Sequence, residues 1–202
     1  GSGTHVWKFT AMLKTGEMTE DDMTEVESCM SRSAGHCMTM GTAATMMGIA
    51  EAVGLTLPGA SSIPAADANH VRMSAECGRR IVQMVWDNLT PAKMLTRANF
   101  DNGVACAMAM GCSTNAIIHL IAMSRRAGHP ITLDDFDAAS RVVPVIANIR
   151  PSGERYLMED FFYAGGLPAL LQRMRLHLHT DALTVNGHTL GDNIAAAEVY
   201  ND

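Results

Sequence analysis

The chain has 202 residues, of which 48% are hydrophobic, and this composition favours a globular fold with one or two cores over a disordered chain. Its formal net charge of −6 and its scattered Lys and Arg residues argue against a basic face that would follow a nucleic-acid backbone. The apolar runs fall short of the roughly 18 residues that a membrane-spanning helix requires, and the first residues lack a secretion-signal pattern, so we expect a cytoplasmic protein.

Helix-forming patterns dominate the first half of the sequence. Apolar residues at helical spacing predict a helix over residues 5–14, and Thr19 is a good N-cap for a second helix through about residue 30. After the loop SRSAGHC, a third helix is predicted over residues 37–53, with a glycine as its stop signal. A proline-containing loop then leads into a long helix over residues 66–89.

The second half of the sequence continues the helical pattern with one exception. Helices are predicted over residues 97–110 and 113–127, after Thr132, and over 158–178, where a Gly-Gly-Leu-Pro motif interrupts the last one. The run VVPVIANI, residues 142–149, predicts a strand because it is short, β-branched and apolar. Such a strand usually lies within a parallel sheet, so we expect its neighbours outside this sequence. A short strand and an Asn-Gly turn are predicted near the end.

One of the five cysteines is a candidate functional residue. The cysteines form no CxxC pair, which argues against a zinc ribbon, and their odd number is a poor disulfide framework. Cys37 follows a glycine-containing loop and begins a predicted helix, where unpaired N–H groups and the helix dipole would lower the pKa of its thiol. The residues alone leave open a nucleophile, a zinc ligand, an iron–sulfur ligand or a buried structural cysteine. His36, the neighbouring residue, is either a hydrogen-bond partner of a cluster or substrate, or simply an exposed residue.

Several blocks of the sequence, in the same order, resemble those of the dihydroxy-acid and phosphogluconate dehydratase family. They begin at residues 31 (SRSAGHCMTMGTAATM), 78 (GRRIV), 112 (CSTNAIIHL), 131 (ITLDDFD), 150 (RPSGERYLMEDFFYAGGLPAL) and 181 (DALTVNGHTLGDN). The blocks cover nearly the whole chain. The first block lacks the additional cysteine and glycine of the amino-acid biosynthetic enzymes, and so looks like the sugar-acid branch, which includes arabinonate and xylonate dehydratases.

The resemblance implies a fold, a reaction and cofactors. Residues 1–202 would be part of the N-terminal, cluster-binding α/β domain of a two-domain lyase, helix-dominated within this stretch. The enzyme would remove water from a sugar acid to give a 2-keto-3-deoxy acid. Cys37 matches the third of three cysteines that bind an iron–sulfur cluster, expected as 2Fe–2S rather than 4Fe–4S, and His36 would lie beside it. The open iron would polarise the departing hydroxyl, and Mg²⁺ would hold the substrate carboxylate.

A second matching segment is substrate-proximal in this family. Ser113, Thr114 and Asn115 match its Gly-Ser-Thr-Asn motif, which begins a helix near the active centre, although helix capping explains these residue types equally well. Cys112 stands where the family usually has glycine, and we do not expect it to bind the cluster.

The matched blocks omit much of what the family uses. The first two cluster cysteines, the magnesium ligands, the catalytic serine and the β-rich C-terminal domain have no counterpart here. We therefore expect a fragment that contains no catalytic residue, does not turn over substrate alone, and belongs to a homo-oligomer when full length. Two alternatives are a piece of the dihydroxy-acid dehydratase of branched-chain amino-acid synthesis and a helical scaffold that has lost the chemistry.

Overall fold

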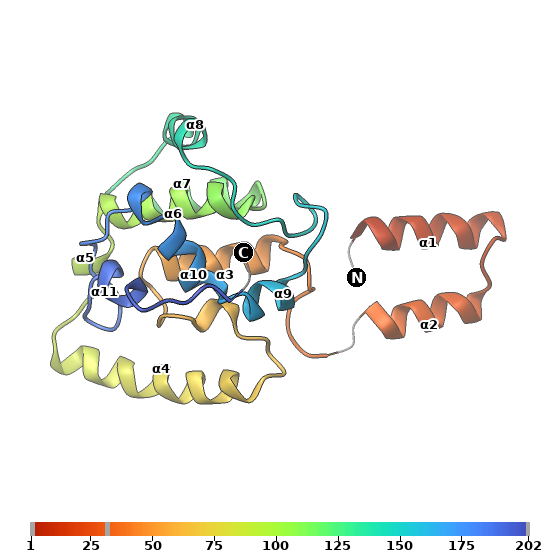
Figure 1. Cartoon of the computed structure of the whole chain (residues 1–202), viewed down its shortest axis with the longest axis horizontal. Helices are drawn as coiled ribbons and strands as arrows, with labels where there is room; N and C mark the ends of the chain where they lie inside the picture. The colour runs from red at the N-terminus through yellow and green to blue at the C-terminus, as the bar shows by residue number, and fades with distance from the viewer. Residues whose placement is uncertain (1–2, 31–32, 201–202) are drawn as a thin grey trace.

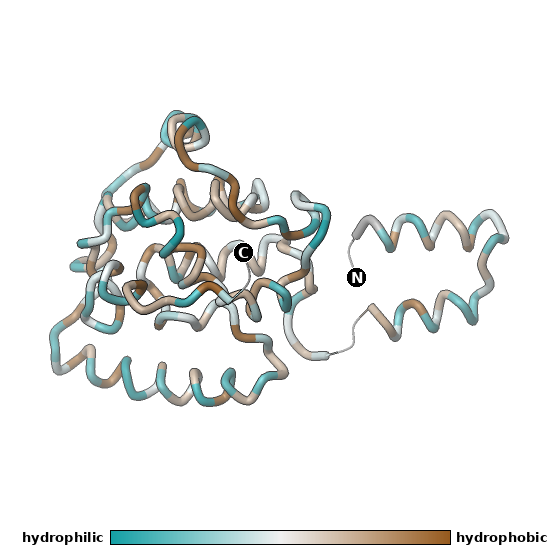
Figure 2. Tube along the Cα trace, in the orientation of Figure 1, coloured by the Kyte–Doolittle hydropathy of each residue, from teal (hydrophilic) through white to brown (hydrophobic). Residues whose placement is uncertain are grey.

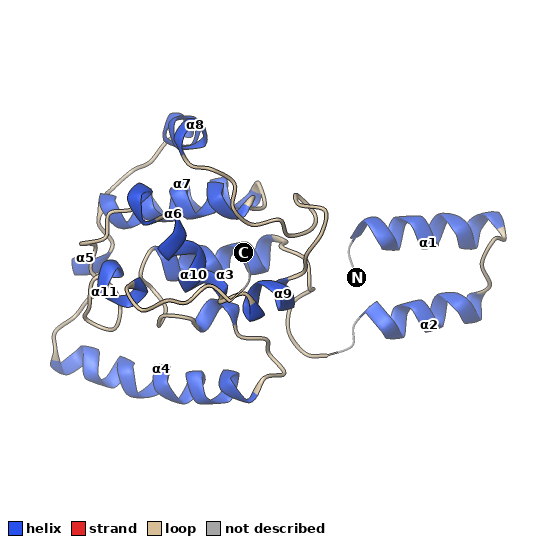
Figure 3. Cartoon of the chain, viewed as in Figure 1, coloured by secondary structure: helices blue, strands red, loops and turns tan. Residues whose placement is uncertain are grey.

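The protein is built mainly of helices joined by loops (Figures 1 and 3). The computed structural model describes residues 3–30 and 33–200. In chain order the helices are α1 (Gly3–Thr15), α2 (Glu20–Met30), α3 (Thr42–Ala52), the 3-10 helix η1 (Ala60–Ser62), α4 (Ala68–Trp86), α5 (Pro91–Met94), α6 (Arg97–Met110), α7 (Asn115–Arg126), α8 (Leu133–Val142), α9 (Met158–Tyr163), α10 (Gly166–Arg173), η2 (Arg175–His177) and α11 (Leu190–Ile194). The predicted dominance of helix is confirmed.

Helices α3 and α6 form the centre of the core (Figure 1). Ile49 of α3 and Val53, its C-cap residue, pack with Phe100 and Val104 of α6, and all four side chains are buried. The two helices approach closely because Gly103 has no side chain at their contact. A Cβ added there would lie 2.7 Å from a methyl group of Val53.

Two buried asparagine side chains hydrogen-bond the C-terminal segment to this core. Asn99 of α6 donates to the carbonyl oxygens of Val53 (2.9 Å) and Leu183 (3.0 Å). Asn102, one turn further along, exchanges two hydrogen bonds with the backbone of His179. Because these buried amides have partners, their burial costs little and fixes the position of the chain after α10.

The predicted strand over residues 142–149 is wrong. Helix α8 continues through Val142, and the chain then runs as an extended segment that makes an isolated bridge between Ile149 and Tyr156. The N–H groups of Ile146 and Ala147 both donate to the carbonyl oxygen of Ala109, at the end of α6, instead of to a neighbouring strand. Within the described residues the β structure is limited to such isolated bridges, so the sheet of an α/β domain is not confirmed.

Another predicted helix differs in detail, and a predicted turn is confirmed. The helix predicted over residues 158–178 is divided into α9, α10 and η2, because Gly165 and Gly166 both adopt positive φ angles (113° and 63°) that end α9. Near the C-terminus the predicted Asn-Gly turn is present, closed by a bridge between Leu183 and Thr189.

Three helices lie at the edge of the molecule. In Figure 1, α1 and α2 form a hairpin beside the main body, and α4 runs along the lower edge of that body. The N-cap predicted at Thr19 is confirmed, since Thr19 and Asp22 exchange side-chain to backbone hydrogen bonds of 2.9 and 3.1 Å. Among the described helices, none is long and apolar enough to cross a membrane.

Candidate functional site

The loop that carries Cys37 is held by backbone hydrogen bonds to a distant segment. The N–H of Met40 donates to the carbonyl oxygen of Arg150, and the N–H of Met158 donates to that of Met38, both at 2.7 Å. These pairings keep residues 38–40 out of a helix. Helix α3 therefore begins at Thr42, and the predicted helix start at Cys37 is wrong by five residues.

The thiol of Cys37 nevertheless lies close to the start of α3. A Cβ added to Gly41, the N-cap residue, would be 3.8 Å from the Cys37 sulfur. The hydroxyl of Thr39, a buried residue, donates to the same sulfur at 3.5 Å. Cys37 is exposed, so its sulfur combines a hydrogen-bond donor from the protein with access from outside.

His36 lies on the exposed side of the same loop. Its Nδ1 is 2.6 Å from the carbonyl oxygen of Cys37. Because a carbonyl oxygen can only accept, Nδ1 carries the proton, and Nε2 of the neutral ring is left as an acceptor. The imidazole therefore lies next to Cys37 without contacting its sulfur through any hydrogen bond in the described part of the chain.

The polar segment between α6 and α7, residues 113–115, is hydrogen-bonded to the first turn of α3. The N–H of Ser113 donates to the hydroxyl of Thr45 at 3.1 Å, and the hydroxyls of Ser113 and Thr42 lie 3.1 Å apart. The side-chain amide of Asn115 also donates to the Thr42 hydroxyl, at 2.8 Å. The segment thus lies at the same end of α3 as the Cys37 loop.

Thr114 differs from its two neighbours. It is the N-cap residue of α7, yet its side chain makes no capping hydrogen bond, and it is exposed. The helix start is capped weakly by Ser113, whose hydroxyl accepts from the N–H of Asn115 at 3.4 Å. Helix capping therefore explains one hydrogen bond of the Ser113 hydroxyl. It explains no hydrogen bond of the Thr114 or Asn115 side chains. The Thr114 hydroxyl has no partner among the residues that the structure describes.

A third segment, residues 148–158, is hydrogen-bonded to the same region. The hydroxyl of Ser152 makes a short hydrogen bond to the carbonyl oxygen of Gly111, the residue before Cys112. Gly111 has a positive φ angle of 63°, and a Cβ there would lie 2.9 Å from the Ser152 oxygen. Glycine is thus required by both its backbone conformation and this close approach.

Two other cysteines are poor candidates for metal ligands. Cys106 is fully buried in α6, and burial raises the pKa of its thiol far above the ordinary value. Cys112 is half-buried against the apolar cluster around Phe100, and burial raises the pKa of its thiol as well. Both environments disfavour the thiolate form that binds iron.

The site contains one soft ligand and several hydroxyls. Within residues 3–30 and 33–200, no three His, Cys, Asp or Glu side chains are grouped to share one metal ion. Cys37 suits one ligand position of an iron–sulfur cluster, because its thiol is exposed and its loop is fixed, but the described residues do not complete the set.

Sequence patterns missed the side chains that bring the segments together. Thr42 and Thr45 are one turn apart on α3, and Ser152 lies in the RPSGER block. The two threonines in GTAAT at a spacing of three were the available signal, since that spacing places both hydroxyls on one face of a helix. Nothing in the sequence pattern indicated that this face meets Ser113.

Comparison with known proteins gives the family. The model of the dihydroxy-acid/6-phosphogluconate dehydratase N-terminal family matches residues 2–193. The L-arabinonate dehydratase of Rhizobium leguminosarum bv. trifolii is 50% identical over 204 residues, which are 100% of this chain and 35% of that protein. The 6-deoxy-6-sulfo-D-gluconate dehydratase of Pseudomonas putida is 48% identical over 202 residues, with the same coverage of both.

A more distant relative acts on another class of substrate by name. The dihydroxy-acid dehydratase of Methanosarcina barkeri is 40% identical over 196 residues, 97% of this chain and 35% of that protein. The chain thus spans about a third of the length of the curated relatives that it matches. With a family model that matches nearly its whole length, the chain belongs to the dihydroxy-acid/6-phosphogluconate dehydratase N-terminal family.

Proposed function

We propose that the chain is part of a sugar-acid dehydratase, a hydro-lyase that converts an aldonate into a 2-keto-3-deoxy acid by loss of water. The names of the relatives support this substrate class. Identity is 50% and 48% to the two proteins named for arabinonate and sulfogluconate, against 40% to the one named dihydroxy-acid dehydratase.

The observation that carries the proposal is the meeting of three distant segments at the start of α3. The Cys37 loop, the Ser113–Asn115 segment and residues 148–158 are joined there by hydrogen bonds. Each of the three contains a block that resembles the dehydratase family. A catalytic centre requires such convergence, whereas a scaffold that had lost its chemistry would have no need to keep an exposed thiol where the three segments meet.

Cys37 is assigned as one of three cysteine ligands of an iron–sulfur cluster, of the 2Fe–2S type. When bound, such a cluster supplies an open iron that acts as a Lewis acid on the departing hydroxyl group. Thr39 orients the ligand sulfur through its hydrogen bond, and His36 lies beside the ligand. The two further cysteines and the ligands of a Mg²⁺ ion belong to parts of the polypeptide outside this chain.

The Ser113–Asn115 segment has two roles in this proposal. Ser113 and Asn115 use their side chains on Thr42, which holds the segment against α3. Thr114 has its hydroxyl free and exposed, and so it is the residue of the three that faces the substrate. The segment thereby leaves one hydroxyl exposed at the end of α3 that also borders the Cys37 loop.

The chain is assigned to a larger α/β domain, with a β-rich domain elsewhere in the polypeptide. The extended segment after α8 supports this, because Val145 and Ile146 are 70% and 40% exposed although β-branched residues favour a buried strand. The segment also borders an open, mainly apolar groove of about 820 Å³ between itself and helices α9 and α10. The cytoplasmic location and the homo-oligomeric state stay predictions.

The test uses the complete polypeptide that contains this chain, reconstituted anaerobically with iron, sulfide and Mg²⁺. We expect dehydration of arabinonate or xylonate to be faster than that of a branched 2,3-dihydroxy acid. We expect Cys37→Ala to abolish both activity and cluster absorbance. Cys29→Ala and Cys77→Ala are matched controls, because these cysteines are also exposed, and they should leave both unchanged.

Two results would overturn the proposal. Preferential turnover of the branched acid would favour the dihydroxy-acid dehydratase alternative, which the 40% identity to the Methanosarcina barkeri protein keeps open. A full cluster in the Cys37→Ala protein would remove the assignment of that ligand. The 202-residue chain alone is expected to show no stoichiometric cluster by visible and paramagnetic-resonance spectroscopy.

A further inference from the structure

Thr39 is held on both sides by backbone hydrogen bonds. The residue before it, Met38, accepts from the N–H of Met158, and the residue after it, Met40, donates to the carbonyl oxygen of Arg150, both at 2.7 Å. Thr39 itself is 7% exposed. The surrounding backbone therefore holds its buried hydroxyl in one place.

The Thr39 hydroxyl has one hydrogen-bond partner among the described residues, the sulfur of Cys37. The hydroxyl donates to that sulfur over 3.5 Å. A buried hydroxyl without a partner costs free energy, so this contact offsets the burial of the Thr39 side chain. Valine has nearly the same shape and no hydroxyl, and a position that needed only this shape could hold it. The hydroxyl therefore indicates a role at the sulfur.

The backbone of Thr39 contacts the same sulfur in the opposite sense. Its carbonyl oxygen accepts from the thiol of Cys37 at 3.7 Å, and it also accepts from the N–H of Gly41 at 2.9 Å. A cysteine that binds iron does so as a thiolate, without its proton. The contact with the carbonyl oxygen is then lost, whereas the hydroxyl can still donate. Among the residues that the structure describes, the Thr39 hydroxyl is the one donor to this sulfur.

A hydrogen bond to the sulfur of a cluster ligand draws electron density away from that sulfur. Such bonds help to set the reduction potential of iron–sulfur clusters, because they stabilise the additional negative charge of the reduced form. They also leave the iron poorer in electrons, which is the property through which a Lewis acid acts. One buried hydroxyl can thus change both properties without contacting the substrate.

We propose that the Thr39 hydroxyl raises the reduction potential of the cluster bound through Cys37 and strengthens the open iron as a Lewis acid. This inference rests on the proposed function, in which Cys37 is a cluster ligand. Thr39 acts through the Cys37 sulfur and is a positioning residue, because its buried side chain is not exposed to the substrate. Its removal should therefore change the cluster and the rate of the reaction, but not substrate binding.

The test is a redox titration of the complete, reconstituted polypeptide, followed by paramagnetic resonance. We expect Thr39→Val to lower the ratio of reduced to oxidised cluster at a fixed potential about ten-fold, which is about 59 mV for one electron. Thr39→Ser keeps the hydroxyl, so its potential should stay close to that of the natural protein. Thr184→Val is the matched control and should leave the potential unchanged. Thr184 is also buried and hydrogen-bonded, but it packs against Gly54, beyond the opposite end of α3.

Steady-state kinetics separates this role from a general loss of structure. With rates expressed per bound cluster, we expect Thr39→Val to lower kcat and kcat/KM by the same factor and to leave KM unchanged. That pattern marks an interaction that acts in the transition state and not in substrate binding. Thr39→Ser should restore kcat, because it restores the donor to the Cys37 sulfur.

Three results would overturn the proposal at different points. A natural polypeptide that takes up no cluster contradicts the proposed function, and this inference with it. A cluster whose potential is the same in the natural protein and in Thr39→Val contradicts the role of Thr39 alone. If the valine variant holds no cluster, the serine variant decides: a full cluster in Thr39→Ser supports the hydroxyl, whereas its loss there too leaves Thr39 a structural role only.

Discussion

Helices α6 and α4 are both regular, yet they relate to the rest of the protein in opposite ways. Helix α6 is buried on nearly every side, and even its asparagines are enclosed and hydrogen-bonded. Helix α4 is longer and has one buried residue, Met84. The core around α6 is therefore complete within this chain, whereas α4 has an apolar face that the chain itself does not cover. The chain thus covers the apolar side chains of α6 and leaves those on the outer face of α4 exposed, where apolar segments recur along the helix (Figure 2).

The sharpest test of this contrast exchanges one aromatic residue in each helix for alanine. Phe100 of α6 is 0% exposed, and we expect Phe100→Ala to lower the free energy of unfolding by about 3–5 kcal/mol through lost burial and a cavity. Trp86 of α4 is 78% exposed, and Trp86→Ala should change that of the monomer by less than about 0.5 kcal/mol. Urea unfolding measures both. Equal losses would show that α4 is as much part of the core as α6.

Glycine-to-alanine exchanges in the two helices should have opposite signs. Gly103→Ala places a methyl group 2.7 Å from Val53, so we expect a loss of about 1–3 kcal/mol from overpacking. Gly78→Ala meets no neighbour and improves helix propensity, so the monomer should gain roughly 0.5–1 kcal/mol. Thermal unfolding of both variants decides the matter, and a destabilised Gly78→Ala monomer would contradict the open environment described for α4.

The sequence predicted the self-sufficient part of the fold best. Helix α6 begins and ends at the predicted residues 97 and 110, because Thr96 caps one end and Gly111 adopts a left-handed conformation at the other. The strand predicted over residues 142–149 was wrong although its pattern was strong. A strand requires a neighbouring strand. In this chain the N–H groups of Ile146 and Ala147 instead donate to the carbonyl oxygen of Ala109, at the end of α6. Local signals determine helices, while strands depend on distant partners.

The sequence selected candidate site residues, whereas the contacts between them are visible only in the structure. The resemblance to the dehydratase family selected Cys37 and the Ser113–Asn115 segment, and the structure brings both to the start of α3. The hydrogen bonds that join them run through Thr42 and Thr45 and span about seventy positions of sequence. Side-chain pairs so far apart leave no periodic pattern, so reasoning from local motifs could not find them.

The buried carboxyl of Glu51 tests how completely the core satisfies its own polar groups. It accepts from the N–H groups of Gly59 (2.6 Å) and Ser61 (3.0 Å), while burial raises its pKa above the ordinary value of 4.5. The folded state then holds the proton more tightly than the unfolded state, so the contribution of Glu51 to stability is full below pH 4.5 and is lost as the pH rises through the raised pKa.

Glu51→Gln removes this dependence because an amide does not titrate, but its single oxygen can keep only one of the two hydrogen bonds, since Gly59 and Ser61 donate to different oxygens of the carboxyl group. We expect the variant to be less stable than the natural chain at the acid end, because one buried N–H loses its acceptor, and we expect this deficit to shrink as the pH rises from 4.5 towards 8. Denaturant unfolding at several pH values provides the measurement. If the difference in unfolding free energy between the variant and the natural chain is constant with pH, Glu51 does not change its protonation in this range.

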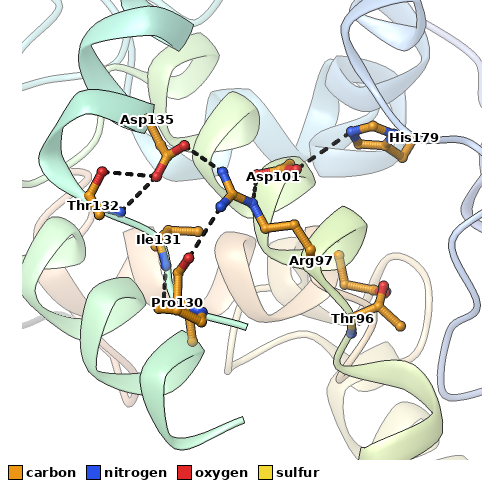
Figure 4. A network of polar contacts seen from close by, with 10 residues as sticks. Thr96, Arg97, Asp101, Pro130, Ile131, Thr132, Asp135 and His179 are labelled. Atoms are coloured by element: carbon orange, nitrogen blue, oxygen red, sulfur yellow. Dashed lines mark hydrogen bonds and ion pairs between the residues drawn. The ribbon is translucent and has the colours of Figure 1, made fainter. Parts of the chain in front are cut away.

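The smallest expected effect lies where the core meets solvent, at the ion pairs of Arg97 (Figure 4). The Arg97 guanidinium donates to Asp101 at 2.7 Å, to the carbonyl oxygen of Pro130 at 3.1 Å, and to Asp135 of α8. The N–H of Thr132, and then Arg97, hold the pKa of Asp135 below its usual range. This network joins α6 to α8, as the buried side chain of Phe136 also does.

Because Arg97 is 46% exposed, solvent screens its ion pairs, and Arg97→Lys should cost about 1 kcal/mol or less. The loss should shrink further in 1 M salt, since screening then acts within about 3 Å. Arg141→Lys is the matched control: its pair with Asp137 is 73% and 63% exposed, and we expect no measurable change. A loss above about 2 kcal/mol for Arg97→Lys would mean that charge, more than the burial of Phe136, holds α8 against the core.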